Sequence, residues 1–325
     1  IEEINNDDFL TMDMYTKKAL ELTINTKNND KYGSLYWLLD QTKTAMGSRL
    51  LKQWIERPLI NQAQIEERLD IVEIFTKYFI QRESVKEILK DIYDLERLSS
   101  RIAFGNINAR DLKWISSSLK VLPELKAQLV SLDEPLLDEL ANKLVDLKHI
   151  TELIDNAIVD NPPLTVKEGG IIKDGFNEEL DELRYIRDHG KQWLANFEQK
   201  ERDKTGIKGL KIGYNRVFGY YIEVTKSYLS LIKDEFNYTR KQSLANAERF
   251  VTPELKEMES KLLSAQDKMV KLEYVLFTQI RDYIKKDVHI LQDVAKVVAK
   301  VDVYQSMAVI SSENSYVRPI FNQEK

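Results

Sequence analysis

Six side chains between residues 240 and 249 are of the types that proteins place on nucleic-acid phosphates. The stretch YTRKQSLANAERFVTPE at 238–254 carries Arg240, Lys241, Gln242, Ser243, Asn246 and Arg249. Lys and Arg neutralise phosphate charge, and amide and hydroxyl groups donate hydrogen bonds to phosphate oxygens. No zinc-finger pattern or base-reading helix accompanies them. The set therefore predicts contact with the backbone of a duplex rather than recognition of its sequence.

Positive charge is concentrated around this stretch although the chain as a whole is acidic. The formal net charge is −5, from 48 Lys and Arg and 53 Asp and Glu. Residues 193–252 contain 11 basic and 7 acidic residues, a local charge of +4, so the remainder carries −9. Within that range, residues 200–216 hold six basic and two acidic residues. A run of charge can also simply solvate a surface, and charge alone leaves that alternative open.

Other kinds of chemistry have little support in the sequence. The absence of Cys removes disulfides, thiolate nucleophiles and Cys-based metal sites. His149, His189 and His289 are far apart in the chain, which favours structural or solvent-exposed roles. Gly213 and Gly219 lie within a β-type pattern and do not form a phosphate-binding loop of the GxxxxGK(S/T) kind. We therefore expect no catalytic, cofactor or metal site in this chain.

A short β-type segment interrupts a sequence that is otherwise typical of helices. In KIGYNRVFGYYIEVT (211–225) apolar residues alternate with polar residues or glycine, which is typical of strands with one packed face. The apolar positions are Ile212, Tyr214, Phe218, Tyr220, Ile222 and Val224. Residues 215–219 are expected to form the turn of a hairpin. We interpret the aromatic stripe as the small core of this insert rather than as a platform for base stacking.

Long helical patterns precede and follow the insert. Residues 177–199 have apolar residues at helical spacing, and Thr252-Pro253 is typical of a helix start. Seven residues separated by alternating steps of three and four then form a coiled-coil seam: Leu255, Met258, Leu262, Ala265, Met269, Leu272 and Leu276. The preceding helix is the nearest partner for this seam. An antiparallel pair would place the insert at its tip.

The rest of the chain also predicts helices and bounds the class of protein. Asn61 is expected to cap a helix, while Gly105-Asn106 and Pro123 are expected to interrupt helices. With 325 residues but only 11 Gly and 7 Pro, the chain predicts two or three compact, mainly helical units. No apolar run is long enough to predict a membrane span. The opening IEEINNDDFL lacks an initiator Met and is not typical of a signal peptide, so we expect a fragment of a cytoplasmic protein.

Six stretches, distributed over nearly the whole chain, carry a resemblance to known proteins: GYNRVFGYYIEVT (213–225), YTRKQSLANAERFVTPELKEME (238–259), DGFNEELDELRYIRD (174–188), GSLYWLLDQTKTAMGSRLLKQWIERPL (33–59), ERLDIV (67–72) and DLERLSSRIAFGNINARDL (94–112). They resemble the MutS family of bacterial DNA mismatch repair proteins. The resemblance implies a mainly α fold, in which a multi-helix core carries two long antiparallel lever helices with a small antiparallel β clamp inserted at their tip. It implies a first part of the core and lever at 1–192, a clamp domain at 193–252, and the returning lever helix with the end of the core at 253–325.

The resemblance also implies that the clamp meets the backbone of double-stranded DNA. The positions that match the DNA-contacting part of the clamp are Arg240, Lys241, Ala245 and Asn246. The candidates added on charge and position are Arg249, Lys211, Asn215 and Arg216. The family implies that the intact protein is a homodimeric, DNA-dependent ATPase that uses ATP and magnesium, binds mismatched DNA and works with the downstream repair factor MutL. Motifs for mismatch reading and ATP hydrolysis do not occur in this chain, so we expect the fragment not to be an enzyme.

Two other interpretations stay open at this point. The chain could be a coiled-coil structural module that serves protein–protein contact without DNA binding, with the insert as a spacer. It could also be an enzyme whose site has no visible motif. Gly213 and Gly219 are expected to serve backbone geometry rather than contact with a ligand.

Overall fold

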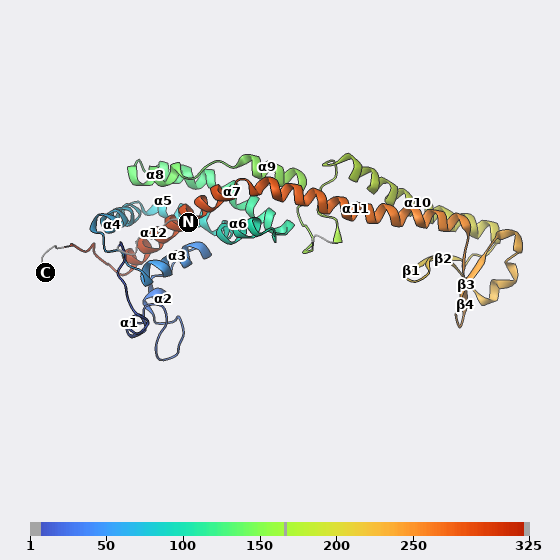
Figure 1. Ribbon diagram of the computed structural model, residues 1–325, viewed down its shortest axis with the longest axis horizontal. Helices are drawn as coiled ribbons and strands as arrows, with labels where there is room; N and C mark the ends of the chain where they lie inside the picture. Colours follow the sequence, from blue (N-terminus) through green and yellow to red (C-terminus); the bar gives the residue numbers. More distant parts are fainter. Residues whose placement is uncertain (1–7, 166–167, 322–325) are drawn as a thin grey trace. The chain divides into compact units, whose positions relative to one another are not determined.

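The computed structural model describes residues 8–165 and 168–321, and it is mainly helical. Residue contacts divide the chain into two compact units, which we call the helical unit (Ile1–Leu164 with Gln279–Lys325) and the sheet unit (Thr165–Thr278). Helices account for 64% of the residues, and four strands form a small antiparallel sheet within the sheet unit (Figure 1). The expected fold class, mainly α with a small β insert, is confirmed.

The helical unit is built around α12 (Val288–Glu313). The helix is buried on most sides between Val294 and Ile310, and it packs against α3, α4, α5 and α6. A helix that is apolar all round must lie in the interior of its unit. The other helices of this unit are α1 (Met14–Ala19), α2 (Leu35–Leu39), α3 (Ala45–Glu56), α4 (Gln62–Lys77), α5 (Phe79–Lys90), α6 (Leu95–Phe104), α7 (Ala109–Val130), α8 (Pro135–Asn142) and α9 (Lys148–Ala157).

Local sequence signals set several of these helix ends. Asn61 accepts a hydrogen bond from the backbone N–H of Gln64 and begins α4, as predicted. Gly105 ends α6 in the left-handed region, with φ of 74°. Asn108 and Asp111 form a reciprocal capping box at the start of α7. These caps satisfy backbone donors and acceptors that a helix end would otherwise leave unpaired.

Pro123 was expected to interrupt a helix, and this expectation is wrong. The residue lies inside α7, which continues from Ala109 to Val130. A proline removes one helical hydrogen bond and costs roughly 3 kcal/mol in a helix interior. Leu119 and Leu122 before it and Leu125 and Leu129 after it are all buried, so apolar packing on both sides of the proline offsets that cost.

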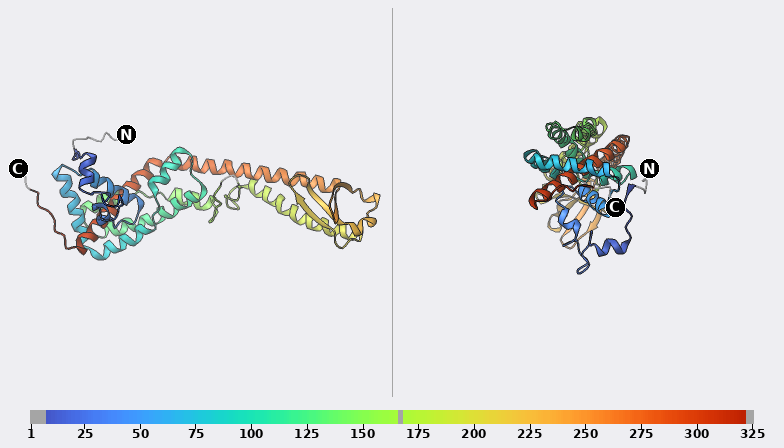
Figure 2. Two further views of the ribbon diagram at one scale, coloured as in Figure 1. Left: turned by 90° about the horizontal axis from the view of Figure 1, so that it is seen from below. Right: turned by 90° about the vertical axis from the view of Figure 1, so that its left-hand side faces the viewer.

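In the sheet unit, α10 (Glu178–Thr205) and the first part of α11 (Pro253–Lys285) run antiparallel, side by side (Figures 1 and 2). Along the pair, residues with rising numbers on α10 contact residues with falling numbers on α11. The guanidinium of Arg184 lies 3.0 Å from a Glu273 carboxylate oxygen. The backbone of Gly190 meets the side chain of Leu262. The antiparallel pair predicted from the seam is therefore confirmed.

The seam residues of α11 and its start also agree with the sequence. Five of them are buried, and Met258 and Leu272 are half-buried. The hydroxyl of Thr252 accepts from the backbone N–H of Leu255 at 3.2 Å, and Pro253 is the first helical residue, as expected for this cap. The sheet and two short 3₁₀ segments, η3 (Lys226–Leu231) and η4 (Asp234–Phe236), occupy the chain between the two helices.

Candidate nucleic-acid interface

The four strands are β1 (Lys211–Asn215), β2 (Gly219–Thr225), β3 (Thr239–Ser243) and β4 (Ala247–Val251). Their order in the sheet is β1-β2-β4-β3, with every neighbouring pair antiparallel. Asn215 pairs with Gly219, and the backbone N–H of Val217 donates to the side-chain oxygen of Asn215 at 2.8 Å. The hairpin turn predicted at 215–219 is thus present. Gly219 closes it with φ of 75°, a conformation that glycine adopts without strain.

One face of the sheet packs against α10 and the start of α11. Its buried residues are Ile222, Val224 and Phe250, which form a cluster with Phe197 and Leu255. Ile212 and Tyr220 pack against the same cluster, as the alternation along 211–225 predicts. The aromatic stripe is nevertheless only partly core. Tyr214 and Phe218, which lie beside the turn, are 49% and 42% exposed.

The opposite face of the sheet carries a small polar and aromatic cluster that sequence reasoning missed. The ring of Tyr221 lies over Gly213, where a Cβ atom would come within 2.6 Å of the ring. The guanidinium of Arg249 stacks 4.1 Å from the centre of the Tyr221 ring. It also donates to the carboxylate of Glu223 and to the side-chain oxygen of Gln242, both at 2.9 Å. This cluster joins β2, β4 and β3 through side chains as well as through the backbone.

Arg249 is therefore committed to contacts inside the sheet. It pairs with Glu223, its cross-strand neighbour, and its side chain is only 18% exposed. Arg240 differs, because its side chain is 64% exposed and its one carboxylate contact, with Glu248, is 3.5 Å long. Of these two predicted arginines, Arg240 is the one whose guanidinium faces solvent, whereas Arg249 supports the sheet.

Six of the eight predicted site residues fall into two groups toward opposite ends of the sheet. Thr225 pairs with Ala247, so the end of β2 lies beside the loop between β3 and β4, which carries Ala245 and Asn246. The residues at or near this end are Lys211, Lys241, Ala245 and Asn246, whereas Arg240 pairs with Phe250 and so lies level with Ile222, midway along β2. Asn215 and Arg216 lie at the other end of β2, about 20 Å away along a strand of that length. The sheet therefore does not bring all eight candidates together.

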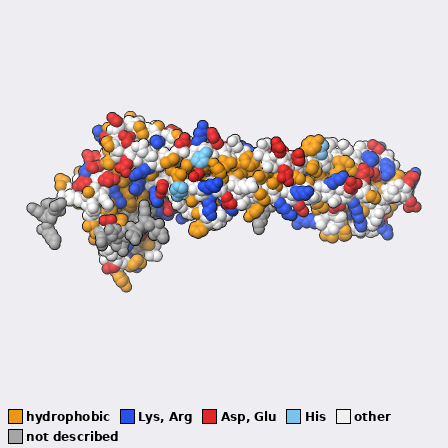
Figure 3. Space-filling view, turned by 45° about the horizontal axis from the view of Figure 1, so that its top comes forward, with side chains coloured by type: hydrophobic (Ala, Val, Ile, Leu, Met, Phe, Trp, Pro, Cys, Tyr) orange, Lys and Arg blue, Asp and Glu red, His pale blue; other side chains and the backbone are white. Residues whose placement is uncertain are grey.

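Five basic side chains around the sheet have no ion-pair partner among the described residues. They are Lys208, Lys211, Arg216, Lys226 and Lys241. The remaining basic residues of 193–252 contact carboxylates, as do Lys200 with Glu254 and Arg202 with Glu198. The local excess of positive charge therefore resides on these five side chains. Figure 3 shows basic side chains intermixed with acidic and apolar ones over the part of the surface that carries the sheet.

Lys226 and Lys208 are absent from the sequence-based candidates. The backbone N–H of Lys226 donates to the carbonyl of Asn246 at 3.0 Å, so this residue adjoins the β3–β4 loop. Only the register between β2 and β4 reveals that neighbourhood, because the two residues are 20 positions apart in sequence. Lys208 was within reach of sequence reasoning, since it lies in the basic run at 200–216.

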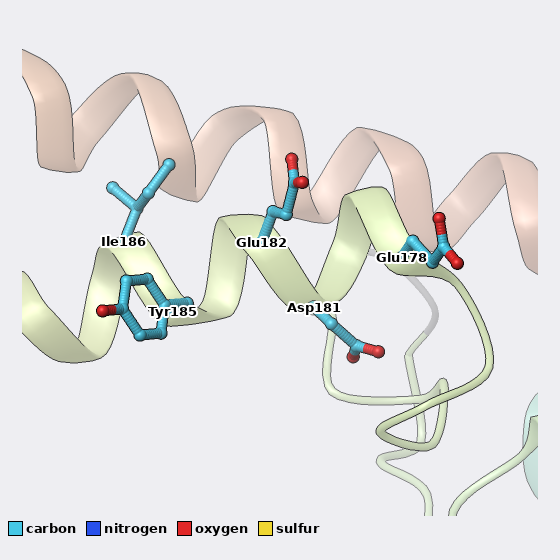
Figure 4. Close-up of a pocket in the computed structure, with 5 residues that line it drawn as sticks. All are labelled: Glu178, Asp181, Glu182, Tyr185 and Ile186. Carbon is cyan, nitrogen blue, oxygen red and sulfur yellow. The ribbon is translucent and has the colours of Figure 1, made fainter.

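The other end of α10 has the opposite charge. A hollow of about 670 Å³ on its first turns is lined by Glu178, Asp181, Glu182, Tyr185 and Ile186 (Figure 4). Acidic side chains are favourable there because the N-terminus of a helix carries partial positive charge. They would repel phosphate. Within the sheet unit, the basic side chains without ion-pair partners among the described residues therefore lie around the sheet, and an acidic cluster lies at the start of α10.

None of the helices in the described part of the chain has the length and apolar character needed to cross a membrane. His149 hydrogen-bonds Asp287 at 2.9 Å, and His189 stacks on Tyr185 with ring centres 3.6 Å apart. These two contacts fit the structural roles that were expected for the histidines. They add no candidate site.

Comparison with known proteins places these observations in a family. The family model described as MutS domain III matches residues 15–308. The chain is 49% identical over 324 residues to the DNA mismatch repair protein MutS of Oceanobacillus iheyensis. It is 50% and 49% identical over 325 residues to the proteins of the same name from Bacillus cytotoxicus and Bacillus cereus. In each case the match covers the whole chain but only 36–37% of the relative's length.

Proposed function

Since this chain belongs to the MutS domain III family, we propose that it is the lever and clamp portion of a DNA mismatch repair protein. In this proposal the four-stranded sheet grips the backbone of double-stranded DNA without reading its sequence. The helices α10 and α11 form the lever that carries the sheet. The observation that carries the proposal is the set of unpaired basic side chains around the sheet, four of them lysines.

The chemistry of this surface fits phosphate better than bases. Lys226 and Lys241 supply charge near the β3–β4 loop, and the exposed amide of Asn246 supplies a hydrogen-bond donor there. Among the described residues of the sheet unit, no helix projects from the packed pair in the way a recognition helix does to enter a groove. The contact should accordingly be indifferent to sequence and sensitive to salt.

The remaining activities belong, in this proposal, to the parts of the intact protein outside this chain. The relatives are nearly three times as long. Their additional length would supply mismatch recognition, ATP and magnesium binding, and most of the homodimer contact, and the intact protein would cooperate with MutL in the cytoplasm. We assign no catalysis to this chain.

The competing function is a coiled-coil module for protein–protein contact without DNA binding. The buried seam of α11 supports a structural role for the helix pair. It offers no reason, however, for five basic side chains without carboxylate partners around the sheet. Neutralising those side chains would leave a pure interaction module unaffected, and this difference separates the two functions.

The test is a fluorescence-anisotropy titration of the chain with a labelled duplex, matched and mismatched, across a salt series. We expect binding at low salt that ignores the mismatch and weakens with a log–log slope of roughly −2 to −4, corresponding to a few phosphate contacts. The double substitution Arg240→Ala/Lys241→Ala should weaken it further. No binding at the lowest salt, or binding with no salt dependence, would refute the clamp function of this chain.

A further inference from the structure

A groove on the helical unit combines an apolar floor with a cation that has no carboxylate partner among the described residues. It has a volume of about 280 Å³ and lies between α3, α4 and α12. Its partly exposed apolar side chains are Trp54, Leu59, Ile65, Leu69, Val72 and Met307. Arg68 lines it as well, with its guanidinium 3.5 Å from the centre of the Trp54 ring.

Helix α4 has more apolar surface than packing against its own unit requires. Its buried residues Ile71 and Phe75 face the core. A second stripe at Ile65, Leu69 and Val72, spaced by four and three residues, faces the groove. A surface helix of a self-sufficient unit normally has one apolar stripe, so the second one indicates a further contact.

On a third side of α4, by contrast, a cation is paired with carboxylates. Glu66, Asp70 and Glu73 surround the guanidinium of Arg318, at distances of 2.6, 2.6 and 2.8 Å. Arg68 has no such carboxylate among the described residues. Burial is the main cause that lowers the pKa of Arg68, and Tyr304 and Glu67 nearby offset that effect only in part.

Met307 is the one residue of 301–310 that is not buried, which identifies the groove as an opening on an otherwise enclosed helix. Tyr304, on the same helix, contacts Trp54 edge-on with ring centres 5.5 Å apart. Trp54 thus contacts the Arg68 guanidinium through its ring face and lies edge-on to Tyr304, at one side of the groove. A guanidinium held flat by an aromatic ring is well placed for two parallel hydrogen bonds to a carboxylate.

We infer that this groove is the docking site for a segment of the same polypeptide outside this chain, which inserts a large apolar side chain and places a neighbouring Asp or Glu carboxylate on Arg68. The positive charge of Arg68 is complementary to a carboxylate, and the apolar lining fits a large apolar side chain next to it. The relatives are long enough to contain such a segment, because about 63% of their sequence lies outside the match. The inference rests on the chain being part of a longer protein and does not depend on DNA binding.

The test is site-specific photo-crosslinking in the intact protein that contains this chain. Leu69 is replaced by p-benzoylphenylalanine, and the crosslinked peptide is mapped by mass spectrometry. We expect an intramolecular crosslink to a peptide outside residues 1–325, with an Asp or Glu within a few residues of the attachment point. The same replacement at Phe79, which is 58% exposed on α5, is the matched control and should give no such product.

Arg68→Gln provides the second arm. In the crosslinking background it should lower the yield of the intramolecular product about tenfold, the factor that corresponds to 1.4 kcal/mol. In the chain alone, urea unfolding should show only a small loss of stability, because the guanidinium there contacts the Trp54 ring but no carboxylate. A crosslink to a second molecule, a product confined to residues 1–325, or no product would overturn the inference. A large loss of stability of the isolated chain on Arg68→Gln would also overturn the inference, because Arg68 would then be a structural residue.

Discussion

At the scale of the residue, two glycines in the sheet unit serve different purposes. Gly219 needs its positive φ of 75° to close the β1–β2 turn. Gly213 has no such requirement, but it leaves room for the ring of Tyr221, which in turn supports Arg249. The sequence predicts a geometric role for both glycines. Only the first depends on backbone conformation, and the second depends on packing across the strands.

Gly213→Ala should destabilise the sheet unit by about 1–3 kcal/mol, because the new methyl group would overlap the Tyr221 ring. Gly209→Ala is the matched control, since nothing lies within 4 Å of a Cβ at that position. Urea unfolding of both variants measures the difference. Equal stability of the two variants would show that Tyr221 moves aside without cost.

Asp302 is a carboxylate inside the helical unit that organises the start of α3. It accepts hydrogen bonds from the backbone N–H groups of Lys43 and Thr44, from the Thr44 hydroxyl and from the Gln305 amide, at 2.7–2.9 Å. Asp302→Ala leaves these donors unsatisfied and should cost about 2–4 kcal/mol in unfolding free energy. Asp293→Ala, at an exposed position on the same helix, should cost far less. A small effect of Asp302→Ala in urea unfolding would contradict this role.

The buried carboxyl group of Asp302 should also make the unfolding free energy depend on pH. Burial is the main cause that raises the pKa of this carboxyl above its ordinary value of 3.8. Between the ordinary and the raised value, the folded state holds a proton that the unfolded state has lost, so stability falls as pH rises through this window. The unfolding free energy of the wild type relative to Asp302→Asn should therefore decrease across it. An increase over the same range would mean that the four hydrogen bonds outweigh burial and lower the pKa.

At the scale of the element, the α10–α11 pair depends on a close approach at one position. A Cβ at Gly190 would lie 2.0 Å from a methyl carbon of Leu262, so the two helices meet backbone against side chain there. Ion pairs at either side, Arg184 with Glu273 and Lys200 with Glu254, keep the same register. A wider separation would uncover the buried seam of α11.

Gly190→Ala should accordingly weaken the pair by about 1–3 kcal/mol, and Leu262→Ala should relieve much of that overlap. In a double-mutant cycle the two substitutions are expected to couple by about 1 kcal/mol or more, with the double variant more stable than the sum of single effects predicts. Urea unfolding of the four proteins gives the coupling energy. Strict additivity would place the two residues out of contact.

Elements with local signals were predictable from the sequence, and those fixed by tertiary contacts were not. The cap at Thr252-Pro253, the seam of α11 and the turn at 215–219 each depend on residues within one or two turns of chain. The predicted interruption at Pro123 was wrong because buried leucines on both sides of it stabilise a continuous α7. Of the candidate site, the position of the basic cluster was predictable from charge. The pairing of Arg249 with Glu223 and the proximity of Lys226 to Asn246 were not, because both follow from strand register.

At the scale of the whole molecule, the acidic average charge conceals a local cationic surface. The chain carries −5 overall and +4 within 193–252, and the five unpaired basic side chains of that range surround the sheet. Attraction of DNA to such a surface is local and is screened by salt within about 10 Å at 0.1 M. We therefore propose that specific lysines around the sheet, rather than total charge, account for the binding of DNA.

The most direct test compares two triple variants of equal charge by anisotropy titration over a salt series. One replaces Lys211, Lys226 and Lys241, on or beside the sheet, by Ala, and the other replaces Lys256, Lys268 and Lys271, at exposed positions on α11, by Ala. We expect the first variant to lose affinity and to flatten the log–log salt slope by about 0.9 for each lost phosphate contact, while the second keeps the wild-type slope. Equal losses in the two variants would contradict the assignment of the sheet as the DNA-binding surface.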